Sequence, residues 1–152
     1  TLIRDPKNHK VEEVIRKNNL EKNIKSLSWV SHKEIPLMLN SSLIYVDSFH
    51  RQMPGGGMGI TAMEAMSCGL PVVLANNPGV KDYVKHGDNG FTYKGGDFRE
   101  LAGCLIKLLK NKKLREKLGK NARKTIFDEI NWDKISRKIE KNYLELASKY
   151  KN

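Results

Sequence analysis

Short apolar runs alternate with stretches of helical apolar spacing along residues 2–93, and this alternation constrains the fold more than any other feature. The runs of strand length cover residues 2–3, 24–30, 43–46, 72–74 and 91–93. The helical stretches between them cover residues 11–18, 33–39, 60–67 and 80–85. Such strand–helix alternation predicts an α/β fold in which helices cover both faces of a parallel sheet.

The sequence after residue 93 contains three helical patterns and no further strand pattern. Asp97 is a good N-cap for the first helix, the second runs through Leu114 and Ile126, and the third begins near Trp132. We therefore expect one domain over residues 1–152, with a carboxyl-terminal helical tail. The chain begins with Thr1 rather than Met, and its first residues fit the end of a strand, so we also expect it to be part of a longer protein.

The chain is strongly basic, with 28 Lys and Arg residues against 17 Asp and Glu residues and a formal net charge of +11. Residues 101–152 hold 15 of the basic and 6 of the acidic residues, so most of the excess lies in the tail. A basic tail is compatible with nucleic acid, an anionic membrane surface or a solvated helix face. These charges are spaced through helical patterns and no nucleic-acid motif accompanies them, so we expect a solvated face and no nucleic-acid partner.

The cysteine and histidine pattern gives no support to metal chemistry. Cys68 and Cys104 lie far apart and the four histidines are scattered, so neither a metal-ligand spacing nor a disulfide framework is present. We expect no metal ion and no cofactor, and a reducing, cytoplasmic setting. No stretch approaches the roughly 18 to 20 apolar residues that a membrane-spanning helix needs, so we expect a soluble chain.

Residues 54–73, PGGGMGITAMEAMSCGLPVV, form the most informative segment of the sequence. A glycine-rich loop follows a predicted buried strand and leads into a helix that starts near Gly59, where free N–H groups and the helix dipole favour a phosphate. Thr61 adds a hydroxyl donor, and Glu64 lies one turn further on, where a carboxylate can accept hydrogen bonds from a ribose. Glycine-rich loops are weak signals, and a surface loop with a solvated Glu64 is the alternative.

The same segment resembles the donor-site block of retaining glycosyltransferases of the GT-B fold, in the large group 1 (family 4) class. The matching residues run from Gly57-Met58-Gly59-Ile60-Thr61 through Glu64 to residues 65–73, AMSCGLPVV. The resemblance continues over residues 26–31, 77–84 and 87–91 and to the Asn-Trp pair that starts the last helix. It covers nearly the whole chain.

The resemblance implies a Rossmann-like domain that forms the carboxyl-terminal, donor-binding half of a GT-B fold. The implied activity is retaining transfer of a hexose from a nucleotide diphosphate sugar to a glycan or lipid-linked acceptor. The donor-binding residues that it implies are Gly57, Met58, Gly59, Ile60, Thr61 and Glu64. Trp29, Val30 and Ser31 fall where the family forms its base pocket, although core packing is an equal interpretation for Trp29.

One departure from the family pattern concerns the donor sugar. The family has a Glu eight residues before the position of Glu64, and that position is Gly56 here. The preceding segment is also longer than usual, so Arg51 or Gln52 is a candidate for the sugar contact. The departure motivates a second interpretation, a non-catalytic or regulatory relative. A third, an epimerase acting on nucleotide sugars, shares the fold, but residues 64–69 fit the transferases better.

A further expectation concerns what lies outside the chain. In the family, the cationic residues that neutralise the diphosphate and the acceptor-binding domain precede the segment matched here. Since catalysis in this class is mainly positioning and charge stabilisation, we expect the 152 residues alone to be inactive. Many relatives act on lipid-linked acceptors, so peripheral contact with the cytoplasmic membrane face is the alternative to a solvated face for the basic tail.

Overall fold

A computed structural model describes residues 2–3, 9–27, 30–47 and 59–150 of the chain. The chain divides into two compact units, Thr1–Met38 and Leu39–Asn152. The expectation of a single domain over residues 1–152 therefore stays a prediction. Helix α2 (Ile35–Asn40) spans the boundary between the two units.

The first unit pairs two short parallel strands around one helix. Strand β1 (Leu2–Ile3) lies beside β2 (Ser26–Leu27), and helix α1 (His9–Lys17) connects them. The helix ends where Asn19 adopts a left-handed conformation with a φ of 53°, which asparagine tolerates better than most residues. The parallel pairing connected by a helix is the βαβ arrangement that the alternating pattern predicts.

The second unit contains a parallel sheet in the order β3-β4-β5. Its strands are β3 (Tyr45–Asp47), β4 (Val72–Ala75) and β5 (Phe91–Tyr93). All four residues of the central strand β4 are buried, because the strand has a neighbour on each side and helices on both faces. The predicted parallel sheet is therefore confirmed, and the register places Asp47 beside Leu74 at its carboxyl edge.

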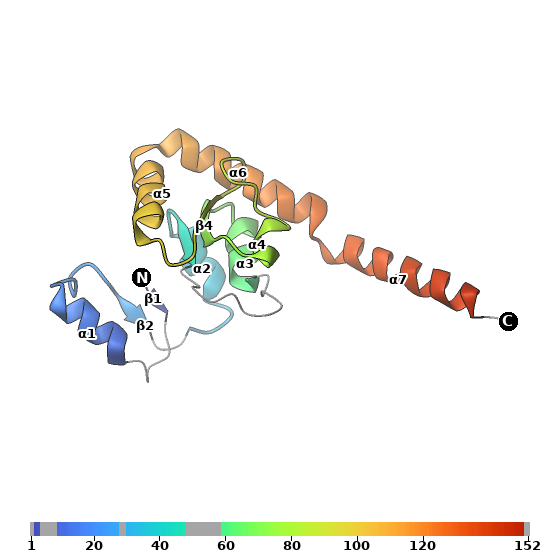
Figure 1. Cartoon of the computed structure of the whole chain (residues 1–152), viewed down its shortest axis with the longest axis horizontal. Helices are drawn as coiled ribbons and strands as arrows, with labels where there is room; N and C mark the ends of the chain where they lie inside the picture. Colours follow the sequence, from blue (N-terminus) through green and yellow to red (C-terminus); the bar gives the residue numbers. More distant parts are fainter. Residues whose placement is uncertain (1, 4–8, 28–29, 48–58, 151–152) are drawn as a thin grey trace. The chain divides into compact units, whose positions relative to one another are not determined.

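Helices cover both faces of this sheet (Figure 1). Helix α3 (Ile60–Ser67) contacts β3 and β4, and α5 (Phe98–Lys110) contacts β4 and β5. Short helix α4 (Pro78–Lys81) follows β4. The main core cluster lies on the α5 side and consists of Val73, Ala75, Phe91, Tyr93, Leu108 and Leu118.

Helix α6 (Lys112–Glu129) fixes the carboxyl ends of two other helices. Its Arg115 guanidinium donates to the carbonyls of Leu108 and Leu109 at 2.7 and 2.9 Å, and Arg123 donates to the Ser67 carbonyl of α3 at 2.6 Å. A cation at a helix carboxyl end stabilises the exposed carbonyls and the dipole. Two of the tail's positive charges therefore have structural partners.

A glycine pair allows α6 to approach α3 closely. Gly119 is buried in α6, and a Cβ atom added to it would lie 2.0 Å from the carbonyl oxygen of Gly69. Gly69 has a φ of 76° and follows the last turn of α3. Its N–H donates to the Met66 carbonyl at 2.9 Å, and that of Leu70 donates to the Ala65 carbonyl at 3.0 Å, the hydrogen bonds of a Schellman motif.

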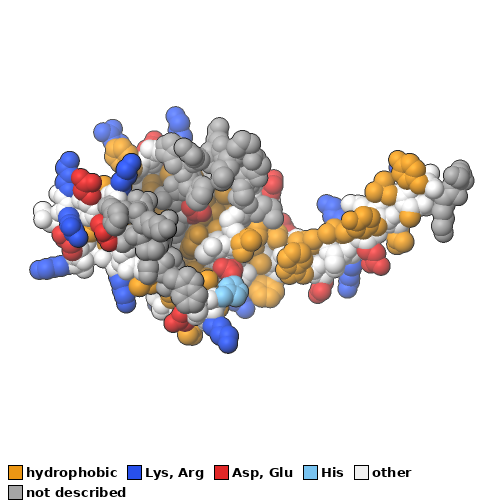
Figure 2. All heavy atoms as spheres, turned by 90° about the horizontal axis from the view of Figure 1, so that it is seen from below, with side chains coloured by type: hydrophobic (Ala, Val, Ile, Leu, Met, Phe, Trp, Pro, Cys, Tyr) orange, Lys and Arg blue, Asp and Glu red, His pale blue; other side chains and the backbone are white. Residues whose placement is uncertain are grey.

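Helix α7 (Trp132–Lys149) has no buried residue. Its amino-terminal end is capped by Asn131, whose side chain accepts from the N–H of Lys134 at 2.9 Å. Figure 2 shows hydrophobic side chains in a line along this helix, at the right of the view. The exposed large hydrophobic residues of this helix include Trp132, Ile139, Tyr143 and Leu146, and the exposed Tyr150 follows its last turn.

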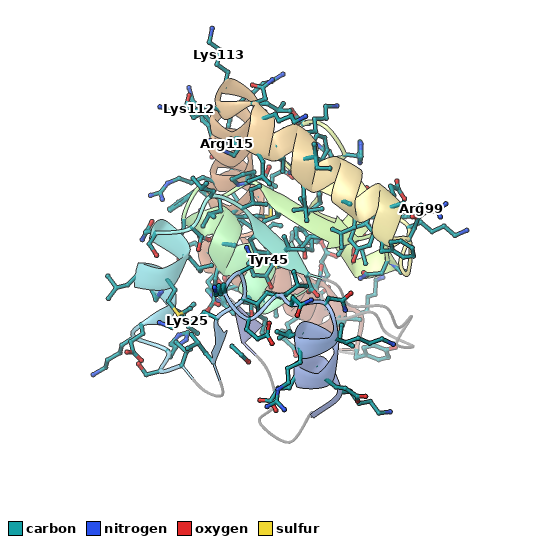
Figure 3. All side chains as sticks on the ribbon, turned by 90° about the vertical axis from the view of Figure 1, so that its left-hand side faces the viewer. Lys25, Tyr45, Arg99, Lys112, Lys113 and Arg115 are labelled. Carbon is teal, nitrogen blue, oxygen red and sulfur yellow. The ribbon has the colours of Figure 1, made fainter. Side chains whose placement is uncertain are left out.

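Other tail charges face away from the sheet. Figure 3 shows Lys112 and Lys113 extending outward from the first turn of α6 and Arg99 extending outward from the first turn of α5. All three residues are exposed. This placement agrees with the prediction of a solvated helix face.

Candidate functional site

The site is built around the start of α3, at the carboxyl edge of the β3-β4-β5 sheet. Helix α3 connects the parallel strands β3 and β4, so its first turn follows the carboxyl end of β3, where ligands bind in open α/β sheets. Gly59 precedes the helix with a φ of 51° and a ψ of 71°, a left-handed conformation that favours glycine. Its carbonyl accepts from the N–H of Ala62 and Met63 at 2.8 and 3.1 Å.

Among the residues that the structure describes, no side chain caps the amino-terminal end of α3, which begins after Gly59. By contrast, each described helix after β4 has a capping side chain at its start. These side chains belong to Asn77, Asp97, Asn111 and Asn131. A helix start leaves N–H groups without intrahelical partners, and the dipole makes it favourable for an anion. The uncapped start of α3 is therefore suited to accept a phosphate.

A tyrosine on β3 connects the strand to the first turns of α3. Burial raises the pKa of Tyr45 to about 12, and the carboxylates of Asp47 and Glu64 add to the rise. A hydrogen bond with the Thr61 side chain acts in the opposite direction. Tyr45, labelled in Figure 3, thus lies within reach of two α3 residues that the sequence singled out.

Tyr83 lies in the turn after α4, and its hydroxyl lies near Gly59. Its side chain is 2% exposed, and a Cβ atom added to Gly59 would lie 3.4 Å from the Tyr83 hydroxyl oxygen. Burial, and then the Asp47 carboxylate, raise the pKa of Tyr83 to about 12. Among the residues that the structure describes, its hydroxyl is the one buried side-chain polar atom without a hydrogen-bond partner. Such an atom costs about 1–3 kcal/mol of folding free energy.

Asp47 lies at the centre of the tyrosine arrangement. It ends β3, and its backbone carbonyl accepts a hydrogen bond from the Tyr93 hydroxyl at 3.2 Å. Burial, and then the Asp47 carboxylate, also raise the pKa of Tyr93. Three tyrosine hydroxyls from β3, the turn after α4 and β5 therefore gather near one carboxylate at the edge of the sheet.

A buried asparagine holds the turn that carries Tyr83. The Asn89 amide nitrogen donates to the Tyr83 carbonyl at 2.8 Å and to the Thr125 hydroxyl of α6 at 2.9 Å. Its side-chain oxygen accepts from the N–H of Lys85 at 2.7 Å. With 1% of its surface exposed and all three bonds made, Asn89 fixes the backbone next to the site.

The structure brings together the described members of the predicted donor site on α3. Gly59 and Glu64 are half-buried, whereas Ile60 and Thr61 are exposed. Because these residues share the first turns of one helix, a single ligand at the helix start can reach several of them. The other sequence predictions for this segment, Arg51, Gln52, Gly56, Gly57 and Met58, lie outside the described residues.

The predicted base pocket belongs to the first unit. Trp29 lies outside the described residues, and Val30 is half-buried. The Ser31 hydroxyl donates to the Glu34 carboxylate at 2.6 Å, and the Ser31 N–H donates to the same oxygen at 3.1 Å. These two bonds, the hydroxyl first, lower the pKa of Glu34. Ser31 thus has a structural partner in the turn before α2.

Three residues of the site, Tyr45, Asp47 and Tyr83, are not among those predicted from the sequence. One signal for Asp47 was available, since it is the first polar residue after a predicted buried strand, and parallel strands present ligand-binding residues at their carboxyl ends. Tyr83 had no comparable local signal, because its place depends on a contact with Gly59, which lies 24 positions earlier in the sequence.

Within residues 2–3, 9–27, 30–47 and 59–150, no three His, Cys, Asp or Glu side chains gather in a way that could hold a metal ion. None of the described helices combines the length and apolar composition needed to cross a membrane.

Comparison with known proteins shows the family. The family model described as "Glycosyl transferases group 1" matches residues 4–125. The chain belongs to this family. The group 1 chain is 31% identical over 94 residues to an N-acetyl-alpha-D-glucosaminyl L-malate synthase of Bacillus anthracis, a match that covers 62% of the chain and 25% of that protein. The chain thus spans about a quarter of this relative's length.

Solved structures share the fold at lower sequence identity. The C-terminal domain of the group 1 family protein LpcC from Francisella tularensis has a TM-score of 0.72 and 22% identity, with 81% of the group 1 chain and 62% of that chain covered. Anabaena HepE, solved in complex with UDP and glucose, has a TM-score of 0.81 and 24% identity, with 90% and 36% covered. The predicted Rossmann-like, carboxyl-terminal half of a GT-B glycosyltransferase is therefore confirmed as the fold of this chain.

Proposed function

We propose that this chain binds the nucleoside diphosphate part of an activated sugar at the start of α3, as the donor-binding half of a retaining hexosyltransferase. The uncapped helix start behind Gly59 carries the proposal, because it offers backbone N–H groups and a favourable dipole to a diphosphate. The half-buried Glu64 lies about one helical turn further on, at the distance a ribose attached to that diphosphate would reach. HepE, which shares the fold, was solved with UDP and glucose bound.

The remaining donor contacts belong to the same proposal. Backbone groups of Met58, Gly59 and Ile60 face the diphosphate and the sugar, and the Thr61 hydroxyl adds a hydrogen bond to a phosphate. The base pocket is formed by Trp29, Val30 and Ser31, and the sugar contact by Arg51 or Gln52. Transfer to a glycan or lipid-linked acceptor is the proposed reaction, with the nucleotide sugar as substrate and no metal or cofactor.

The ribose role of Glu64 provides the sharpest test. Binding of UDP, GDP, ADP and CMP to the full-length protein is measured by titration calorimetry, together with the 2′-deoxy form of the nucleotide that binds. Loss of charge-assisted hydrogen bonds to a ribose corresponds to about 1.5–3 kcal/mol, so Glu64→Ala weakens binding roughly 10- to 100-fold. Because the variant no longer contacts the hydroxyls, the deoxy nucleotide and its parent then bind it equally well.

A matched control separates this role from a general charge effect. Glu116 is an exposed carboxylate on α6, paired with Lys112 at 3.7 Å, and Glu116→Ala should leave the affinity for nucleotide unchanged. Absence of binding by all four nucleotides would refute the proposal. Equal affinities of wild type and Glu64→Ala would refute the ribose role alone, and release of free sugar from the bound donor would exclude a purely regulatory relative.

A further inference from the structure

The ring and the hydroxyl of Tyr83 differ in how well the surrounding structure accommodates them. Its ring is buried beside the sheet, where a phenylalanine ring would pack equally well, yet it carries a hydroxyl that has no hydrogen-bond partner among the described residues. Buried polar groups are almost always paired, so an unpaired one calls for an explanation, and a ligand that supplies the partner is one. The hydroxyl is therefore the part of Tyr83 that packing does not explain.

The position of this hydroxyl points to the start of α3. It lies 3.4 Å from the place that a Cβ atom on Gly59 would occupy, so it faces the backbone of the residue that precedes the helix. The hydroxyl is covered in this structure, and contact with a ligand requires a local shift of the backbone at Gly59, which itself carries no side chain. The Asn89 bond to the Tyr83 carbonyl keeps the turn, and with it the phenol, in place.

The chemistry of the phenol fits an anion. A phenol that retains its proton at neutral pH donates a hydrogen bond, and a phosphate oxygen is a strong acceptor. The neighbouring Asp47 carboxylate is also an acceptor, but no hydrogen bond joins it to the Tyr83 hydroxyl. A second anionic oxygen on the Gly59 side would fill that role and face the N–H groups of α3 at the same time.

We propose that the Tyr83 hydroxyl donates a hydrogen bond to a phosphate oxygen of the bound nucleoside diphosphate. This inference rests on the proposed function and adds a residue from outside the α3 segment to the donor site. Binding then supplies the partner that the hydroxyl lacks, and the free energy cost of the unpaired group is removed only in the complex. Tyr83 is accordingly a ligand-binding residue, and its ring is a structural one.

The test is Tyr83→Phe in the full-length protein, which removes only the hydroxyl. Calorimetry compares the affinities for UDP, GDP and ADP with those for uridine, guanosine and adenosine, and urea unfolding measures stability without ligand. We expect about tenfold weaker binding of the diphosphate and unchanged binding of the nucleoside. The free energy of unfolding should stay the same or rise, because an unpaired buried hydroxyl is lost.

Tyr93→Phe is the matched control, because the Tyr93 hydroxyl already has a partner in the Asp47 carbonyl. It should lower the free energy of unfolding and leave the ratio of diphosphate to nucleoside affinity unchanged. A Tyr83→Phe protein that is less stable and binds diphosphate as wild type does would overturn the inference, as would equal weakening for nucleoside and diphosphate. If wild type binds none of the six compounds, the proposed function itself fails and this inference fails with it.

Discussion

The close contact between α6 and α3 allows a stability prediction that can be worked from the structure. In Gly119→Ala the new methyl carbon would lie 2.0 Å from the Gly69 carbonyl oxygen and 3.0 Å from its carbonyl carbon. The obstructing atoms are backbone, held by the two hydrogen bonds that close α3, so no side-chain rotation relieves the overlap. Either α6 or the end of α3 must move.

The size of the effect follows from two opposing contributions. Alanine in a helix interior is favoured over glycine by about 1 kcal/mol. Overpacking a buried site costs about 1–3 kcal/mol and more where the backbone must shift, so we expect a net loss of about 2 kcal/mol. For a protein of this size, that loss corresponds to a decrease of roughly 4–8 °C in the unfolding midpoint.

Gly103→Ala is the matched control in thermal and urea unfolding followed by circular dichroism. Gly103 lies inside α5, and a Cβ atom added to it meets nothing within 4 Å. The substitution should therefore raise stability by about 1 kcal/mol through helix propensity alone. If Gly119→Ala were as stable as Gly103→Ala, the close approach of α6 to α3 would be wrong.

Two other predictions concern the surroundings of the site. Asn89→Ala leaves the Tyr83 carbonyl and the Lys85 N–H unpaired and should lower the free energy of unfolding by about 2–3 kcal/mol. The loss should be less than about 1 kcal/mol for Asn121→Ala, because the hydrogen bonds of Asn121 to Asp88 are exposed to water. Equal losses in urea unfolding would contradict the buried network. The pKa values of Tyr45 and Tyr83 are raised to about 12, whereas tyrosines of the unfolded chain ionise near pH 10. The native protein therefore loses stability as the pH rises from about 10 to 12, because over this range these two phenols ionise in the unfolded state and stay protonated in the folded one. An ultraviolet absorbance titration should show phenols that ionise late, and Tyr45→Phe should have fewer of them than wild type. A wild-type titration without late-ionising phenols would contradict the burial of Tyr45 and Tyr83.

Helix α3 shows how much the sequence predicts where local chemistry decides. Residues 60–67 are expected to be helical, and the structure gives the same bounds, because Gly59 and Gly69 both adopt left-handed conformations at its two ends. Asp97 is likewise confirmed as an N-cap, with its side chain accepting from the N–H of Arg99 and Glu100 at 3.0 Å. Such signals are contained within a few residues of sequence.

The contacts around Gly59 show where sequence reasoning ends. The glycine pattern identifies a place for a ligand, but the hydroxyl behind it comes from a turn that is ordered by Asn89 and α6. From the sequence, a tyrosine in that turn looks like an ordinary core residue. Only the assembled structure shows that its hydroxyl has no hydrogen-bond partner among the described residues. Long-range packing is therefore the part of the site that periodicity and motif spacing do not contain.

The bond between Asn89 and Thr125 has a dynamic consequence for the site. A surface turn normally frays on its own, but this one shares a buried amide with the long helix α6. Opening the turn requires breaking the connection to α6, so the turn and that helix should open as one cooperative unit. The lifetime of the ordered Tyr83 turn is then governed by residues of α6 that no ligand touches.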